Sequence, residues 1–277
     1  MSHKIKTYLG NLVVAFIVIS SLVFALFPFY WAVATSIKPN ELLFQVPPAW
    51  VFEPTTKNYE LVFKDWKVAN FLTNSVIVTS ISSLLCVGAG TLAAFALARF
   101  KFRGRESLAS ELLSIRMFPP VVVAIPIFVL AYYLNLLNTY TILVLVYATF
   151  NIPIVTIIMR SFIDEIPIEI EESGMIDGCT RVTAFLRITL PLCRDAILSV
   201  LVLSAIFSWN EFLFGTILTR METRTLPVIA GQTMTQRGID WGPAAALTII
   251  TAGPMLLFGM LIQKYLVRGM TFGAVKG

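Results

Sequence analysis

The apolar residues of this chain are gathered into long runs without a charged residue, and not at the spacing of a surface helix or strand. Residues 7–37, 68–98 and 241–263 form three such runs. Each is long enough to cross a bilayer once as a helix of about 20 residues. The runs therefore predict three membrane-spanning helices before anything else is considered.

Two further stretches add three more spans. Residues 117–159 hold 43 residues without a charge. As one helix they would be about 65 Å long, twice the roughly 30 Å hydrocarbon core, so we expect two spans broken near residues 135–140. Residues 196–219 are interrupted only by Glu211 and form another span. The pattern as a whole predicts an all-α membrane protein with six transmembrane helices.

Composition agrees with this interpretation. Only 13% of the 277 residues are charged, and the mean hydropathy is +0.81, whereas soluble domains carry about 25% charged residues. The net charge of +5 is therefore interpreted through the positive-inside rule and not as a nucleic-acid patch. With six spans, 13 of the 21 basic residues lie on the side of both termini. This predicts cytoplasmic tails at 1–8 and 265–277, and an outer loop at 37–69.

The most charge-rich segment, 163–192, lies between the fourth and fifth spans and carries its own helix signals. Pro167 suits a first helical turn, and Gly178 can supply a left-handed stop. Thr180 can then cap a second helix, which Leu190-Pro191 would end. We expect an exposed acidic first helix, carrying Glu169, Glu171 and Glu172, and a second helix with one apolar face, formed by Val182, Phe185, Leu186 and Thr189. An ordinary solvated hairpin would have the same outline.

The residues of this loop resemble a known motif. E-E-S-G-M-I-D-G-C-T at 171–180, followed by L-P at 190–191, is similar to the EAA loop of ABC-importer permeases. In that family the loop forms coupling helices that dock on the ATP-hydrolysing subunit. The resemblance implies that coupling rests on Glu171, Glu172, Ser173, Gly174, Asp177, Gly178, Leu190 and Pro191. Ser173-Gly174 stand where the family pattern has Ala-Ala, and Cys179 also replaces an Ala.

Other segments extend the resemblance over nearly the whole chain. S-I-K-P at 36–39, M-F-P-P at 117–120, W-N-E at 209–211 and the ending G-A-V-K-G at 273–277 are similar to maltose-transporter-like carbohydrate permeases. This implies a multi-pass permease of the bacterial inner membrane that imports a sugar or polyol. The implied partners are a homologous permease, two ATP-binding cassette subunits, an extracytoplasmic solute-binding protein and membrane lipid.

The chain contains no G-x-x-x-x-G-K-[ST] sequence, the loop that cradles nucleotide phosphates. We therefore expect ATP and Mg²⁺ to bind the partner subunits, and this chain to be a transport subunit and not an enzyme. Cys86, Cys179 and Cys193 lack metal-ligand spacing, so no metal, other cofactor or catalytic residue is predicted. We expect them to be small buried or loop thiols.

Three polar residues in the spans are candidates for the translocation pathway. Arg116 is followed by three prolines within ten residues, which must bend or break the helix. It could snorkel to the interface, face the pathway or pair with Glu111. Asn210 and Glu211 interrupt the fifth span, where an ionisable group faces a bundle interior or water. A structural role for Glu211 remains equally open.

Two alternatives stay open at this stage. The small residues of 88–96 could serve close helix packing or line the pathway. The chain could also be a self-sufficient secondary transporter or channel, although no inverted repeat or pair of intramembrane acids is evident. A membrane enzyme would need a cluster of His, Cys or carboxylates, and the single His3 lies at the very start.

Overall fold

The computed structural model describes the backbone of residues 2–235 and 238–272, and the side chains of residues 10–233 and 240–261. In the predicted tail 265–277, residues 265–272 continue α13 as helical backbone, and the G-A-V-K-G ending at 273–277 lies outside the described residues. The chain divides into one unit made of Met1–Val68 and Gln232–Ala252 and a second made of Ala69–Gly231 and Gly253–Gly277.

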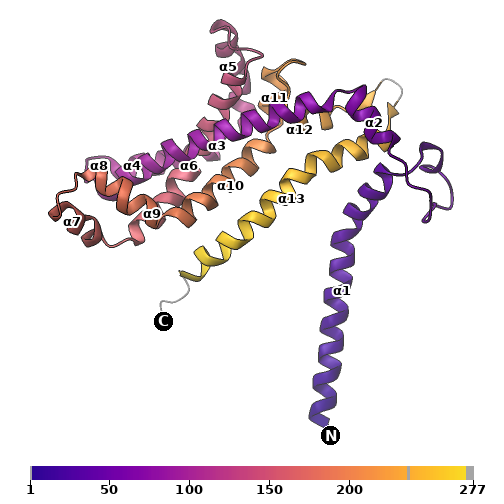
Figure 1. Cartoon of the computed structure of the whole chain (residues 1–277), viewed down its shortest axis with the longest axis horizontal. Helices are drawn as coiled ribbons and strands as arrows, with labels where there is room; N and C mark the ends of the chain where they lie inside the picture. Colours follow the sequence, from indigo (N-terminus) through magenta and orange to yellow (C-terminus); the bar gives the residue numbers. More distant parts are fainter. Residues whose placement is uncertain (1, 236–237, 273–277) are drawn as a thin grey trace. The chain divides into compact units, whose positions relative to one another are not determined.

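Helices make up most of the described chain (Figure 1). In chain order the elements are α1 (Ser2–Ser36), a 3₁₀ turn (Asn40–Leu42), α2 (Lys57–Lys64), α3 (Val68–Arg99), α4 (Arg105–Met117), α5 (Pro120–Tyr133), α6 (Tyr140–Glu165), α7 (Ile168–Ile176), α8 (Arg181–Ala184), a π-helical turn (Phe185–Thr189), α9 (Leu190–Leu192), α10 (Arg194–Trp209), α11 (Leu213–Leu218), α12 (Leu226–Ala230), β1 (Met234–Thr235), β2 (Gly238–Ile239) and α13 (Trp241–Phe272). The two strands form a minimal antiparallel hairpin.

Four helices in the described residues are long and apolar enough to cross a membrane: α1, α3, α6 and α13. Two bent helix pairs raise the number of candidate spans to six if each pair counts as one. The first is α4 with α5, which meet at 93°, and the second joins Arg181–Leu192 to α10 at 76°. The fold class is therefore an all-helical membrane protein with four to six candidate spans.

The second unit is built around α3, α6 and α10, which run side by side in Figure 1. One buried apolar cluster includes Phe95 and Met159, and another includes Leu143 and Phe214. Cys86 and Cys193 belong to the first cluster, which confirms that they are small buried thiols. These clusters hold the helices in fixed register and position the polar groups described below.

Close packing explains part of the small-residue stretch in α3. A Cβ added at Gly90 would lie 2.6 Å from Cγ1 and 2.9 Å from Cβ of Val155 on α6. A Cβ at Gly88 would meet nothing within 4 Å. The close approach of α3 to α6 at Gly90 therefore needs glycine, as expected where small residues let helices touch.

The predicted break of the third span is confirmed. α4 ends at Met117 and α5 begins at Pro120, with a bend of 93° between them. The turn between the third and fourth predicted spans is also confirmed, because α5 ends at Tyr133 and Thr139 caps α6 by accepting the N–H of Ile142.

The expectation of a continuous fifth span over 196–219 is wrong. The helix stops at Trp209 and restarts at Leu213, so α10 and α11 are separate. No proline or glycine marks this break. The physical reason is that the carboxylate of Glu211 accepts the first free N–H groups of α11, which stabilises a new helix start.

In the first unit, α1 begins at Ser2, so the basic residues predicted to form a tail lie in the first turns of the helix. The segment 37–69, predicted to be an ordered outer loop, is ordered by buried polar contacts. Lys38 donates to the backbone oxygen of Ala49 and lies 5.3 Å from the ring centroid of Trp31. The Asn58 side chain donates to the backbone oxygens of Ser36 and Lys38.

Candidate coupling loop and membrane cavity

The loop between α6 and α10 has the predicted helix–glycine–helix form. α7 ends at Ile176, and Gly178 follows with φ +94°, a left-handed value that favours glycine. The Thr180 side chain then accepts the N–H of Thr183 and caps α8. In Figure 1 this hairpin lies at one end of α6 and α10. The sequence signals were sufficient here because each acts through the local backbone.

The expectation that the acidic face of α7 is exposed is wrong for Glu171. Its side chain is only 6% exposed, and Arg99, the last residue of α3, donates to it through Nε at 2.9 Å. The Thr189 hydroxyl donates to the same Glu171 oxygen at 2.9 Å. Arg99 also donates through Nη2 to the backbone oxygens of Ile163 and Ile166, each at 2.9 Å. We call this set the Arg99 joint.

The remaining predicted coupling residues differ in their exposure to solvent. Glu172, Ser173, Asp177, Gly178 and Pro191 are exposed. Gly174 instead faces the second half of the hairpin, since a Cβ there would clash with Cδ1 of Ile188. The glycine that stands in place of alanine therefore permits close packing of α7 against the π-helical turn.

Two expectations about the second helix are wrong. Leu190-Pro191 does not end it, because the helical backbone continues through the π-helical turn into α9 and stops at Leu192. Pro191 is the second residue of α9 and lies one residue before this continuous helical backbone ends. The predicted apolar face is split. Phe185 and Thr189 are buried, whereas Val182 and Leu186 are 68% and 55% exposed.

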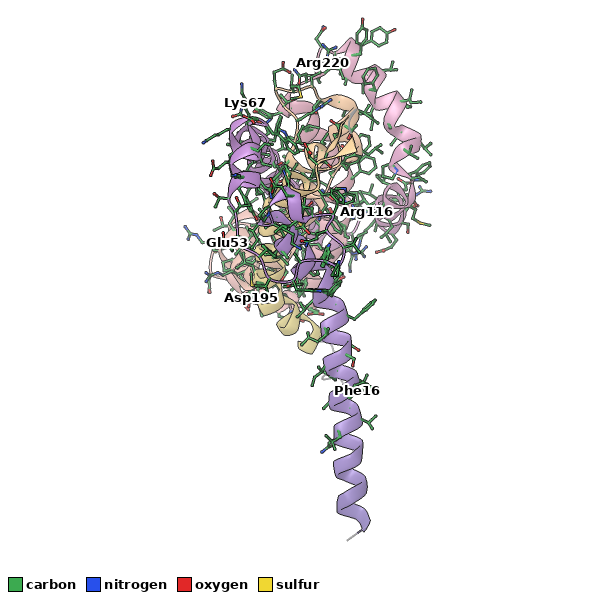
Figure 2. All side chains as sticks on the ribbon, turned by 90° about the vertical axis from the view of Figure 1, so that its right-hand side faces the viewer. Phe16, Glu53, Lys67, Arg116, Asp195 and Arg220 are labelled. Carbon is green, nitrogen blue, oxygen red and sulfur yellow. The ribbon has the colours of Figure 1, made fainter. Side chains whose placement is uncertain are left out.

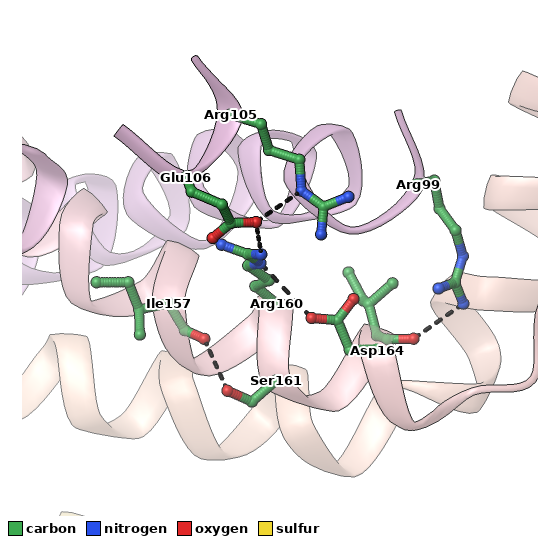
Figure 3. A network of polar contacts seen from close by, with 8 residues as sticks. Arg99, Arg105, Glu106, Ile157, Arg160, Ser161 and Asp164 are labelled. Carbon is green, nitrogen blue, oxygen red and sulfur yellow. Dashed lines mark hydrogen bonds and ion pairs between the residues drawn. The ribbon is translucent and has the colours of Figure 1, made fainter. Parts of the chain in front are cut away.

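A second ion network lies beside the joint, at the same end of α6 (Figure 3). Arg160 contacts Glu106 at 2.7 Å and Asp164 at 3.5 Å, and Arg105 contacts the same Glu106 oxygen at 3.2 Å. The Glu106 side chain is 71% exposed. This network ties α4 to α6 through the largely exposed Glu106, whereas both charged side chains of the Arg99 joint are buried.

The two ionisable pathway candidates, Arg116 and Glu211, line one cavity of about 230 Å³. Its walls are largely aromatic and also include Phe118, Pro120, Tyr147, Phe150, Asn151, Phe207 and Phe214. The cavity lies where both helix breaks occur, between α4 and α5 and between α10 and α11. Broken helices at membrane depth are found where they line a cavity or are covered by protein.

Arg116 (labelled in Figure 2) is held in this cavity by three contacts. Its Nη1 donates to the backbone oxygen of Phe150 at 3.1 Å and to the side-chain oxygen of Asn151 at 3.2 Å. Its guanidinium carbon lies 4.3 Å from the centroid of the Phe207 ring. Within the described residues no ion pair joins it to Glu111, so that predicted alternative is wrong.

Asn151 continues the polar contacts into the core. Its amide donates to the Ser208 hydroxyl at 3.2 Å, and Ser82 of α3 donates to the same hydroxyl at 3.0 Å. All three side chains are buried. Sequence reasoning missed Asn151, although the single Asn in the apolar stretch 139–159 was a usable signal. The aromatic walls could not be found, since phenylalanine occurs throughout the spans.

Glu211 and Asn210 have different surroundings. The two Glu211 carboxylate oxygens accept the N–H groups of Phe214 and Gly215, each at 3.0 Å. Asn210 is exposed and donates to the backbone oxygen of Ile206 and to the sulfur of Met255. It is not among the residues that line the cavity. Glu211 is thus a helix cap that also lines the cavity, and Asn210 lies apart from it.

The far end of α3 holds the loop between α11 and α12. The Asn74 amide donates to the backbone oxygens of Glu222 and Arg224, and the Ser75 hydroxyl accepts the N–H of Leu226. Asn138, in the turn before α6, donates to the Glu222 carboxylate. The backbone N–H of Glu222 and this bond from Asn138 lower the pKa of Glu222 below its usual value.

Fold and site together define an all-helical integral membrane protein with a helical hairpin outside its spans and an aromatic-walled cavity between broken helices. The family described as "Binding-protein-dependent transport system inner membrane component" matches residues 86–272. The chain belongs to this family, and it is a permease of the inner membrane.

Relatives cover nearly the whole chain. It is 32% identical to the trehalose/maltose transport system permease protein MalG of Thermococcus litoralis, over 92% of this chain and 93% of the relative. It is also 32% identical to the diacetylchitobiose uptake system permease protein DasC of Streptomyces coelicolor, over 91% and 92%. The sulfoquinovosyl glycerol transport system permease protein SmoH of Agrobacterium fabrum is 33% identical, over 92% and 90%.

The same fold occurs in a solved structure. A bacterial ABC transporter involved in the import of the acidic polysaccharide alginate has a chain with a TM-score of 0.79 and 21% identity, covering 93% of this chain and 96% of that one. At this identity the likeness concerns the fold alone.

Proposed function

We propose that the chain is one of two permease subunits of an ATP-driven, binding-protein-dependent importer for a sugar or polyol. The relatives named for trehalose, maltose and diacetylchitobiose support the solute class. The absence of a phosphate-binding P-loop sequence supports ATP hydrolysis on two separate cassette subunits. The observation that carries the proposal is the hairpin 165–191, which exposes five of the eight residues that the family resemblance assigns to coupling: Glu172, Ser173, Asp177, Gly178 and Pro191.

The exposed residues of the hairpin form the docking surface for an ATPase subunit. Ile176 is 86% exposed and precedes the exposed Asp177. An apolar side chain bordered by acidic groups suits a groove on a soluble partner. Gly178 fixes the turn that presents them, because its φ of +94° is unfavourable for other residues.

The test uses substitutions on this surface. Asp177→Lys and Gly178→Asp are expected to leave the subunit inserted while ATP hydrolysis no longer drives uptake. The complete complex is purified, the recovered ATPase subunit is quantified, and uptake per ATP hydrolysed is compared with the unsubstituted chain. Normal uptake by both variants would show that the docking assignment is wrong.

The topology follows from the same proposal. α1, α3, α4 with α5, α6, α10 with α11, and α13 form six spans, and both termini with their basic tails lie in the cytoplasm. α8 and α9 remain in the cytoplasmic hairpin, since Arg181 and Arg187 are exposed on it. Single cysteines at positions 182 and 138 test this arrangement by labelling from the outside. Reaction at position 182 but not at position 138 would contradict it.

The cavity with Arg116 and Glu211 forms this subunit's part of the translocation pathway, and a homologous permease completes it. Aromatic faces and fixed polar groups are the means by which proteins bind compact polar ligands. The solute is first identified by binding candidate sugars and polyols to the cognate solute-binding protein.

With that solute, Arg116→Ala is expected to lower uptake about fivefold or more, since it removes a stacked cation worth about 1 kcal/mol or more. Arg116→Lys should retain part of the activity. ATP hydrolysis by the same preparations serves as the control, and equal losses of hydrolysis and uptake would contradict a pathway role.

The alternative of a self-sufficient transporter or channel has no observation in its favour. It predicts uptake by the isolated chain in liposomes without any ATPase, and that measurement separates the two functions.

A further inference from the structure

The Arg99 joint fixes the hairpin to two of the spans by buried contacts. Arg99 and Glu171 side chains are 7% and 6% exposed, so solvent hardly screens the ion pair. If α7 moved away from α3, Glu171 would be left buried without its counter-charge or would have to be hydrated. Arg99 would also release the backbone oxygens of Ile163 and Ile166 at the end of α6.

We infer that Arg99 is a positioning residue that transmits any displacement of the hairpin to α3 and α6, so that the three move as one rigid body. The inference rests on the proposed function, in which an ATPase subunit binds the hairpin. The contacts of Arg99 are the ones through which a displacement of the hairpin reaches the spans. They are distinct from the exposed residues that dock on the ATPase subunit.

At its other end, α3 would transmit such a movement to the loop between α11 and α12. Asn74 and Ser75 hold the loop between α11 and α12 through three hydrogen bonds to its backbone. Asn74 and Arg99 are 25 residues apart on one continuous helix, a separation of about 38 Å. A single helix therefore connects the hairpin with a loop at the opposite end of the unit, and coupling along it acts in both directions.

The neighbouring ion network provides a matched control. Glu106 links α4 to α6 at the same end of the bundle, but its side chain is 71% exposed. Exposed ion pairs contribute little because water and salt screen them. Glu106→Gln thus removes an ion pair near the joint without releasing α7.

The first experiment uses the full chain in lipid nanodiscs, with Cys86, Cys179 and Cys193 replaced by alanine. Spin labels are placed at Ile168→Cys on α7 and Leu92→Cys on α3, both exposed positions. The reference chain should give one narrow distance distribution by pulsed EPR.

Glu171→Gln should broaden this distance distribution, and Thr189→Val, which keeps the side chain's shape, should broaden it less. Glu106→Gln should leave it narrow. A distribution that stays narrow in Glu171→Gln overturns the inference.

The second experiment repeats the distance measurement in the assembled importer, without nucleotide and after trapping with ATP and vanadate. The reference distance should not change on trapping, because the hairpin and α3 move together. In Glu171→Gln trapping should add a second, shifted peak while ATP hydrolysis persists, and Arg99→Lys should show a smaller shifted fraction than Arg99→Ala. A trapping-induced shift in the reference chain overturns the inference.

Failure of the proposed function can be distinguished from failure of the Arg99 joint. If no ATPase subunit assembles with the reference chain, the importer assignment is wrong, while the nanodisc measurement still decides whether the joint holds α7 to α3.

Discussion

Single residues in this protein take their roles from what they touch as much as from their type. Glu171 and Glu172 are adjacent and chemically identical, yet the first is buried against Arg99 and the second is exposed. Gly88 and Gly90 are two residues apart on α3, yet of the two only Gly90 lies against another helix. Neighbouring residues of one kind therefore make matched pairs for experiments.

At the residue scale, Gly90→Ala is expected to destabilise the chain by about 1–3 kcal/mol, because its Cβ would overlap Val155. Gly88→Ala should be neutral or stabilising by up to about 1 kcal/mol, since it adds helix propensity and meets nothing within 4 Å. Thermal unfolding in nanodiscs measures both. Equal shifts of the midpoint for the two variants would contradict close packing at Gly90.

Helices of this protein end for two kinds of reason, and only one is visible in sequence. Proline ends α4, and Gly178 ends the first half of the hairpin, as predicted. The break between α10 and α11 instead depends on Glu211, which accepts two N–H groups at the start of α11. A glutamate within an apolar run is ambiguous until the partners of its carboxylate are known.

At the element scale, Glu211→Ala is expected to cost about 1–3 kcal/mol, because buried N–H groups at the start of α11 lose their acceptors. Glu211→Gln keeps one acceptor oxygen and should cost less. Unfolding midpoints of the two variants are compared with that of Asn210→Ala, a change outside the cap. A loss for Glu211→Ala no larger than that of Asn210→Ala would contradict the capping role.

At the scale of the whole molecule, most of the first helix is left uncovered by the part of the chain that the structure describes. Within Gly10–Ser36, an apolar stretch of 18 residues has 0% of its residues buried, and the Phe16 side chain is 71% exposed (Figure 2). A helix that is apolar on all sides is stable only where something apolar covers it. Its high hydropathy fits lipid or another membrane helix.

A spin label at Phe16→Cys is therefore expected to be accessible to oxygen, which dissolves in lipid, and protected from a water-soluble relaxation agent. A label at Glu53→Cys, in the outer segment, should show the opposite accessibility. Power-saturation EPR on the chain in nanodiscs provides both values. Strong relaxation of the Phe16 label by the water-soluble agent would contradict its place in a membrane.

Much of the fold followed from local signals. The outer turn after Tyr133, the break after Met117 and the turn at Gly178 were all predicted, because proline, glycine and capping residues act within a few positions of backbone. The faces of the hairpin were not. Val182 and Leu186 were assigned to the buried side, but the π-helical turn shifts the helical register after Ala184.

The sequence by itself determined that the protein is a helical membrane protein, where its helical hairpin lies and which family it resembles, since long apolar runs and motif residues are properties of the chain order. Only the tertiary structure decided that Glu171 is buried on Arg99, that Arg116 and Glu211 share a cavity with Asn151, and that Asn210 lies apart. These facts depend on contacts between helices distant in sequence, and the packing of apolar side chains between those helices sets them.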